Sequence, residues 1–447
     1  MADPFSTPFD DDLPEELRGA LEPDDGLPDD DDDDDFLPHG GGAARALAAL
    51  TLGAALMGAV FASISTADFV QHLDRDVHAI HCSFLPGAEA DLGESGCRTV
   101  MMSTYSSFFR TDMWGGFPVS LWALAVFAFL AYRAGHLALR GRPERHETGF
   151  LVAATLLPVG MSIIYGYLAV AEVGATCKSC IGIYIASGGA FVFSLLAHLA
   201  ARRRFDAPAG RTFAVGFFEG VGFVAALTLV YLVMVPAADP AKALAGCGGL
   251  VKPDDPNGIM LHMGPVPGGT PMIDVLDPLC PACKAFESRL KGSGFLAGLD
   301  RRSVLFPLDS ECNWMVGTSL HPGACAVSEA ILCAGGRVRG HAGNPAAARR
   351  ILDWAFELQE GLLVHAKADP KAFRRRLEKE FPEVRGCLGR SRARNKLNKG
   401  MRWMVANALP VLTPQAFIGG RAICPEDTDL GLEFTLSEMT RRPGALR

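Results

Sequence analysis

Five stretches of the sequence lack Asp, Glu, Lys and Arg altogether, although 21% of all residues are charged. They hold 19 to 24 residues each and cover 46–67, 113–132, 148–171, 179–201 and 220–238. A helix that crosses a bilayer needs about 20 consecutive apolar residues. This absence of charge excludes an ordinary soluble protein and predicts a membrane protein with five spanning helices.

Basic residues are almost missing from the first 40 residues, which hold sixteen acidic side chains and the single basic Arg18. Without a basic segment ahead of the first apolar stretch, the sequence does not fit a cleaved signal peptide. An unbroken run of Asp at 29–35, several Pro and few apolar residues leave little surface to bury. We therefore predict that residues 1–42 form a disordered acidic arm that solubilises the chain.

Cysteine is missing from two loops that are rich in arginine. These loops follow the second and fourth apolar stretches and carry Arg133, Arg140, Arg142 and Arg145, and Arg202, Arg203, Arg204 and Arg211. Short arginine-rich loops remain in the cytoplasm, which places the N-terminus inside and the chain after residue 238 outside. All twelve cysteines then lie on the outer side or at its edge, where disulfides persist. Both signals predict a multi-pass membrane protein whose C-terminal domain lies in an oxidising compartment, such as the periplasm outside a bacterial inner membrane.

The chain after residue 239 has the charged, Gly- and Pro-punctuated composition of a soluble domain. Residues 271–276 and 303–309 are predicted strands, and 280–290 is a predicted amphipathic helix between them. A mostly helical stretch then extends to about residue 405. The segment LPVLTPQAFIGGRAI returns the chain to a strand.

The motif CPAC, with Cys280 and Cys283, begins the predicted helix 280–290. Backbone N–H groups and the helix dipole stabilise a thiolate at a helix N-terminus, so the pKa of Cys280 should be lowered. Cys283 lies one turn further on, where it can resolve a mixed disulfide. The motif therefore predicts a dithiol for thiol–disulfide exchange.

The order strand, CPAC, helix, helical insertion and then Thr413-Pro414 before AFIGG resembles a DsbA-like disulfide oxidoreductase with a thioredoxin fold, over roughly residues 265–430. The resemblance implies that Pro414 is cis and faces the dithiol, with Thr413 beside it. Six further cysteines are predicted to form structural disulfides, and their spacing favours Cys312–Cys325. The other pairings among Cys247, Cys333, Cys387 and Cys424 stay open.

The membrane part has a resemblance of its own. Cys82 and Cys97 lie in the outer loop, Ser103 follows six residues later, GGFPVSLW begins the next apolar stretch, and C-K-S-C at Cys177 and Cys180 opens the fourth. This pattern resembles the vitamin K epoxide reductase family over about residues 45–238. Bacterial members are often fused to a thioredoxin-like domain through a fifth helix.

Together, the two resemblances imply an α-helical membrane bundle with a four-helix core and a fifth linking helix, followed by an α/β thioredoxin-fold domain with a helical insertion. The implied domains are the arm at 1–42, the membrane domain at 43–210, the fifth helix and linker at 211–264, and the thioredoxin-like domain at 265–447.

The C-K-S-C pair lies where water meets lipid. One helical turn, about 4.5 Å of rise, separates its cysteines, so Cys177 can exchange with the outer loop while Cys180 faces a lipid-soluble quinone. The predicted path takes electrons from reduced exported proteins to the CPAC pair, then to Cys82 and Cys97, and finally through Cys177 and Cys180 to ubiquinone or menaquinone. We predict a monomer with membrane lipid around it and no nucleic-acid partner.

Five polar residues each allow two interpretations. The resemblance implies that Ser103 and Tyr184 lie near the quinone, but Ser103 could also be a helix cap and Tyr184 a membrane-interface aromatic. In HAIHC, His78 and His81 could suggest a metal site, but solvated loop histidines fit better, and we predict no metal. Glu219, near the inner end of the fifth stretch, could be functional or could reach the headgroups, which we favour.

Two other functions compete with disulfide formation. The same cysteines could pass electrons outward to reduce or isomerise disulfides, since spacing does not set redox potentials. In a different class, the C-x-x-C pairs could be soft ligands of a membrane metal-handling protein. The proline inside CPAC and the lack of a Met/His cluster favour exchange chemistry. Activity on an epoxide and the identity of the quinone stay open.

Overall fold

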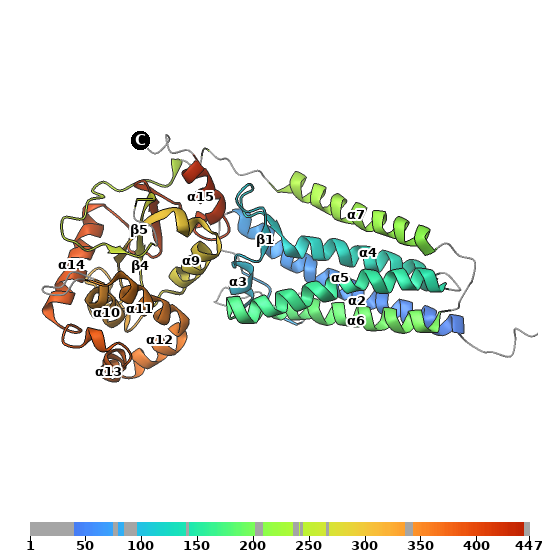
Figure 1. Ribbon diagram of the computed structural model, residues 1–447, viewed down its shortest axis with the longest axis horizontal. Coiled ribbons are helices and arrows are strands. Elements are labelled where there is room, and N and C mark those ends of the chain that lie inside the picture. The colour runs from blue at the N-terminus through green and yellow to red at the C-terminus, as the bar shows by residue number, and fades with distance from the viewer. Residues whose placement is uncertain are drawn as a thin grey trace, which may run out of the picture.

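The computed structural model describes residues 40–74, 79–84, 96–139, 143–201, 209–235, 241, 245–264, 268–335 and 343–441. It has two parts, which we call the helix bundle (40–235) and the sheet region (245–441), and they lie end to end (Figure 1). Most of the predicted acidic arm, with residues 1–39, lies outside the described residues, as does His78.

The five predicted membrane helices are present. They are α2 (Gly40–Gln71), α4 (Val119–Leu139), α5 (Arg145–Leu168), α6 (Lys178–Ala200) and α7 (Ala209–Met234), and all are long and apolar enough to cross a membrane. The bounds differ from those of the uncharged stretches. For example, α4 begins six residues after 113 and runs past Arg133, and α7 begins before Glu219. These two charged side chains lie inside helices and form an ion pair of 3.2 Å between α4 and α7.

Four of these helices form the core of the bundle, and the fifth lies along its outside (Figure 1). Small side chains such as Ala48, Ala55 and Ala186 are fully buried beside Phe127. Small residues allow helix backbones to approach closely in a membrane. The apolar part of α7, by contrast, is only 6% buried, so most of its surface is available to lipid.

Short elements cover the end of the bundle that faces the sheet region. They are helix α3 (Gly96–Met101) and the two-residue strands β1 (Ser107–Phe108) and β2 (Phe117–Pro118), which pair antiparallel. A turn of π-helix, Ala169–Val173, extends α5, and Gly174 ends it in the left-handed conformation that glycine adopts without strain. The turn delivers the chain to Cys177 at this same end.

The sheet has five strands in the order β3-β5-β4-β6-β7. Their bounds are β3 (Leu261–His262), β4 (Thr270–Leu276), β5 (Leu299–Leu305), β6 (Gln415–Ile418) and β7 (Arg421–Ala422), and only the β4–β5 pair is parallel. The predicted strand 271–276 is confirmed as β4. The predicted strand 303–309 lies closer to the N-terminus in the structure, because β5 covers Leu299–Leu305, and Pro307 has no N–H with which to extend the ladder. Since β3 precedes residue 265, the sheet starts before the predicted domain boundary.

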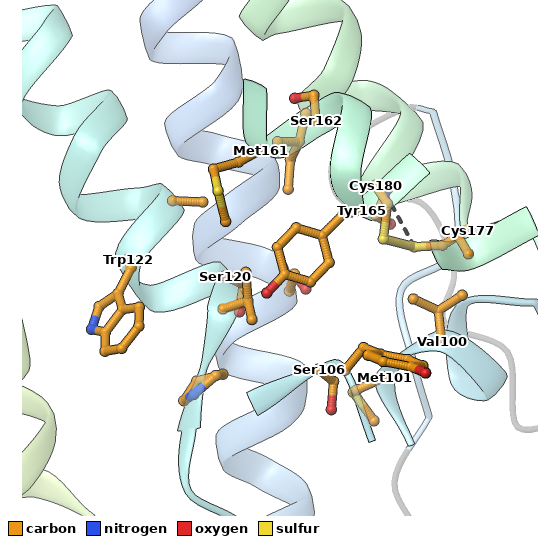
Figure 2. A pocket seen from close by; sticks show the side chains of 18 of the residues that line it. Val100, Met101, Ser106, Ser120, Trp122, Met161, Ser162, Tyr165, Cys177 and Cys180 are labelled. Atoms are coloured by element: carbon orange, nitrogen blue, oxygen red, sulfur yellow. Dashed lines mark hydrogen bonds between the residues drawn. A yellow bond between two sulfur atoms is a disulfide. The ribbon is translucent and has the colours of Figure 1, made fainter. Parts of the chain in front are cut away.

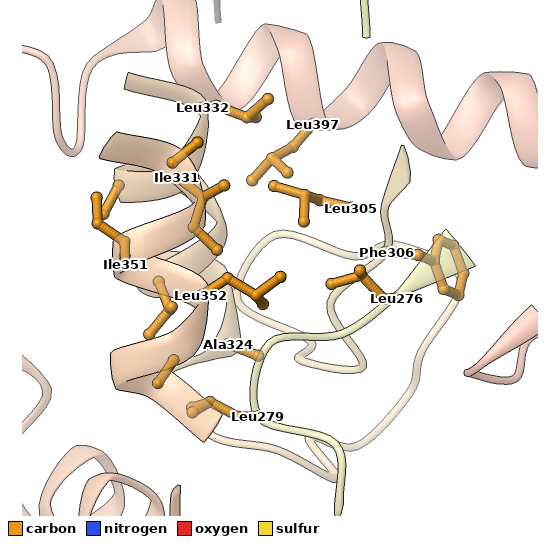
Figure 3. Packing of buried hydrophobic residues seen from close by; sticks show 14 of the residues in the cluster. Leu276, Leu279, Leu305, Phe306, Ala324, Ile331, Leu332, Ile351, Leu352 and Leu397 are labelled. Carbon is orange, nitrogen blue, oxygen red and sulfur yellow. The ribbon is translucent and has the colours of Figure 1, made fainter. Parts of the chain in front are cut away.

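Helices cover both faces of the sheet. They are α9 (Pro281–Gly292), α10 (Ala324–Gly335), α11 (Pro345–Glu357), α12 (Gln359–Ala368), α13 (Pro370–Glu380), α14 (Ser391–Ala406) and α15 (Leu432–Arg441). Val275 faces a large core built with α10, α11 and α14, where Ile331 and Leu397 pack (Figure 3). Met272 faces a smaller core with Phe286 of α9. Strand residues alternate between faces, which explains the two cores.

Three disulfides join distant parts of the sheet region. The predicted Cys312–Cys325 bond is confirmed, and the structure adds Cys333–Cys387 and Cys247–Cys424. Cys247–Cys424 closes the longest loop, with a sequence separation of 177. It ties the segment after α7 to the segment before α15.

Candidate functional site

Four of the predicted site cysteines meet at the end of the bundle that faces the sheet region, as two disulfides, Cys82–Cys97 and Cys177–Cys180. Cys97 lies on α3 and is 3% exposed, and Cys177 is the N-cap of α6 and 6% exposed. The backbone N–H of Cys180 donates to the Cys177 sulfur at 3.1 Å. All four share one apolar cluster.

Gly96 explains how the two disulfides come together. A Cβ at this position would lie 2.1 Å from the carbonyl oxygen of Thr176, a distance that no side chain tolerates. The backbones next to Cys97 and Cys177 therefore touch, and only glycine permits the contact. This contact places the Cys82–Cys97 disulfide, which we call the loop disulfide, against the Cys177–Cys180 disulfide, which we call the bundle disulfide.

The segment that carries Cys82 is held by its neighbour His81. The ring Nδ1 of His81 lies 2.7 Å from Asp68 of α2, and its backbone N–H donates to the same carboxylate at 3.0 Å. Ser179 of α6 donates to the His81 carbonyl oxygen at 2.9 Å. His81 is a loop residue whose side chain is 40% exposed, as interpreted, and its ring is in addition paired with Asp68. Among the described residues, no group of three or more His, Cys, Asp or Glu side chains could hold a metal.

A cavity of about 390 Å³ lies between α2, α4, α5 and α6, and the Cys177–Cys180 disulfide forms part of its wall (Figure 2). Most of its lining is apolar. Several hydroxyl groups interrupt that lining, among them those of Ser103, Ser120, Ser162, Tyr105, Tyr165 and Tyr184. A mostly apolar cavity with a few polar groups is typical of a site for a small organic ligand.

Ser103 and Tyr184 both line this cavity, where the family resemblance puts them. The alternative for Ser103, a helix cap, does not hold, because it follows α3 and its hydroxyl donates to the Val100 carbonyl oxygen at 2.7 Å. Tyr165 was missed by the sequence interpretation. It lies in an apolar helix two residues from Tyr167, and the sequence does not say which of the two faces inward.

The second dithiol lies at the start of α9 in the sheet region. Cys280 is the N-cap, Cys283 is one turn inside, and both are free thiols. The Cys280 thiol donates to the Thr413 carbonyl oxygen at 3.6 Å, and the peptide bond from Thr413 to Pro414 is cis, as expected. The N–H of Asp277 donates to the Cys283 sulfur at 3.5 Å.

The two thiols differ in acidity. The hydrogen bond from Cys283 lowers the pKa of Cys280 to about 6, against the opposing effect of burial. Burial raises the pKa of Cys283, and the neighbouring Cys280 adds to that rise. At neutral pH, Cys280 is therefore mostly a thiolate and Cys283 a thiol, which is the division of roles that exchange chemistry requires.

A buried ion cluster joins the sheet region to the bundle. Glu433 of α15 accepts from Arg110 of the bundle at 3.1 Å and from Arg289 of α9 at 3.2 Å. Arg289 also donates to the Met102 carbonyl oxygen. All three charged side chains are less than 10% exposed. Since a buried charge is costly without its partner, Glu433 is the central contact of this interface.

Residues 427–434, which we call the docking segment, make further contacts. The indole N–H of Trp114 donates to Asp427 at 3.0 Å. A Cβ on Gly431 would lie 2.2 Å from the same indole nitrogen. The docking segment therefore packs directly on the end of the bundle that faces the sheet region.

Leu430 of the docking segment is fully buried in the cluster that holds Cys97 and Cys177. Cys280 and Cys283 belong instead to the large core of the sheet region. The structure thus brings four predicted site cysteines together and holds the other two in a separate cluster.

Residues 49–195 match the family model described as vitamin K epoxide reductase family. The match contains the cavity, except for Val224 of α7, and all four bundle cysteines. Residues 49–195 are therefore similar to this family of membrane redox enzymes, while the sheet region lies outside the match. Neither the curated proteins nor the solved structures compared with the chain include a match.

Proposed function

We propose that this protein is a quinone-dependent thiol–disulfide oxidoreductase that forms disulfide bonds in exported proteins. One observation carries the proposal: the Cys177–Cys180 disulfide borders an apolar cavity on one side and packs with Cys97 on the other. A dithiol formed at this position could receive electrons from the loop pair and pass them to a ligand in the cavity.

The chemistry is a series of exchanges, each moving two electrons and two protons. A reduced substrate protein gives up two thiols and reduces the Cys280–Cys283 disulfide. The resulting dithiol reduces Cys82–Cys97, which then reduces Cys177–Cys180. The last dithiol is oxidised back to a disulfide as quinone becomes quinol. Each transfer between sulfur pairs passes through a mixed disulfide formed by a thiolate.

The sheet region supports its own part of the proposal. A parallel β4–β5 pair, an antiparallel β6, a C-x-x-C pair at the start of α9 and a cis proline beside it are the features expected of a thioredoxin-like fold. The Cys280 side chain is only 5% exposed. Exchange with the bundle therefore requires a rearrangement that uncovers its sulfur.

The orientation proposed from the arginine-rich loops is compatible with this arrangement. The end of α4 and the start of α5 lie at the end of the bundle far from the sheet region (Figure 1). We propose that this end faces the cytoplasm of a bacterium and that the sheet region lies in the periplasm, where substrate proteins emerge.

The test uses the full-length purified protein, a reduced unfolded protein and a short-tailed ubiquinone or menaquinone. We expect quinol and substrate disulfide to form in equal amounts. Cys280→Ser should stop oxidation of the protein substrate and leave quinone reduction by a small dithiol intact. No quinone reduction with either reductant would contradict the proposal, and quinol-driven reduction of substrate disulfides as the dominant reaction would reverse its direction.

A further inference from the structure

Three phenol groups line the cavity, and their hydroxyls have no hydrogen bond within the described part of the chain. Tyr105 follows α3 and is 38% exposed, whereas Tyr165 of α5 and Tyr184 of α6 lie on the bundle helices. Figure 2 shows the ring of Tyr165 reaching into the cavity between the Cys177–Cys180 disulfide and Ser120. A phenol in apolar surroundings usually finds a hydrogen-bond partner. These hydroxyls therefore suit a ligand that accepts hydrogen bonds.

The two tyrosines lie on neighbouring parts of α5 and α6. A Cβ on Gly166, the residue after Tyr165, would lie 3.7 Å from the ring of Tyr184. Tyr167, which lies two residues after Tyr165 on α5, is 66% exposed on the outside of the bundle. Of the two tyrosines in this part of α5, only Tyr165 lines the cavity, because residues two apart on a helix point in different directions.

A quinone has two carbonyl oxygens, and both gain negative charge during reduction. Ser103 is poorly suited to donate to either oxygen, because its single proton already goes to the Val100 carbonyl oxygen. Tyr165 has an unused hydroxyl in the same cavity. A donor aimed at an oxygen on which charge develops lowers the barrier of the reaction.

We infer that Tyr165 is a quinone-binding residue that donates a hydrogen bond to one carbonyl oxygen, beside Tyr184. This inference rests on the proposed function. In the reaction, two electrons and two protons pass from the thiols of Cys177 and Cys180 to the quinone, which leaves a disulfide and a quinol. Both tyrosines keep their own protons at the end of the cycle.

The test compares Tyr165→Phe with the matched control Tyr167→Phe in the full-length protein. With a small dithiol as reductant and a short-tailed ubiquinone as acceptor, Tyr165→Phe should lower kcat/KM for the quinone by about tenfold, as expected for one lost hydrogen bond. Tyr167→Phe should behave like wild type. The rate at which the same dithiol reduces the Cys177–Cys180 disulfide, without quinone, should be equal in all three proteins.

Two results separate this inference from the proposed function. If the wild type reduces no quinone, the proposed function fails. If the wild type is active and Tyr165→Phe keeps its kcat and KM, only the inference fails. As a check that needs no substitution, a photoactivated azido-quinone should label residues 161–165 of the wild-type protein, and labelling confined to positions outside the cavity would overturn the assignment.

Discussion

The two C-x-x-C pairs of this chain share their local geometry and differ in everything around it. In each, the first cysteine is the N-cap of a helix and the second lies one turn inside. Cys177 and Cys180 form a disulfide at an apolar cavity, whereas Cys280 and Cys283 are thiols beside a cis proline. A helix N-terminus can activate a thiolate in both places. The surroundings decide which partner each pair can meet.

The largest effect should come from removing the inner cysteine of the bundle pair. Cys180→Ala should abolish quinone reduction by more than about 1000-fold, because the two-electron step needs both sulfurs. Quinol formation followed by absorbance, with a small dithiol as reductant, measures this effect. Cys283→Ala, the corresponding change in the other pair, should leave that assay unaffected. Comparable losses in both variants would mean that the pairs do not have separate partners.

The contact at Gly96 tests how closely the loop disulfide must approach the bundle disulfide. Gly96→Ala places a methyl group against the Thr176 carbonyl oxygen. We expect transfer from Cys97 to Cys177 to slow by about 100-fold, since small misplacements of reacting groups are costly. Stopped-flow measurement of disulfide reduction would show it. Gly188→Ala is the control, because a Cβ there meets nothing within 4 Å. Equal rates in the two variants would contradict the role of this contact.

The pH dependence of Cys280 tests the origin of its acidity. Its alkylation rate should fall as the pH drops through about 6 and reach a plateau above it, since the thiolate is the reactive form. Cys283→Ala removes the main stabilising hydrogen bond, so the pKa should rise toward the ordinary thiol value and the rate at pH 7 should fall by about tenfold. Cys283→Ser keeps a donor and should retain most of the shift. An unchanged midpoint in Cys283→Ala would assign the low pKa to the helix terminus instead.

The smallest effect concerns the interface between the two regions. Glu433→Gln leaves Arg110 and Arg289 without a carboxylate, although the amide oxygen can still accept one hydrogen bond. We expect hydrogen exchange in the docking segment to be about fivefold faster. Exchange in the Met102–Trp114 part of the bundle should also become faster. Glu438→Gln on the same helix serves as the control. Unchanged exchange in Glu433→Gln would show that the apolar contacts of Leu430 suffice for docking.

Much of the fold could be predicted because its signals are local. Twenty uncharged residues specify a membrane helix wherever they occur, and the strand before CPAC follows from its apolar pattern. The errors came from longer-range contacts. Arg133 and Glu219 lie inside α4 and α7 and pair between these helices, so the uncharged stretches do not mark the helix bounds. The start of β5 at Leu299 depends on its register with β4, which no property of the strand alone reveals.

The sequence by itself determined the five membrane helices, the two C-x-x-C pairs and the positions of those pairs at helix N-termini, because these follow from composition and short spacing. Only the tertiary structure decided which side chains share the cavity, that Tyr165 and not Tyr167 faces it, that Gly96 brings two disulfides into contact, and that Glu433 joins the two regions. These features depend on the rotation and approach of segments distant in the chain, which only the packing of the whole molecule sets.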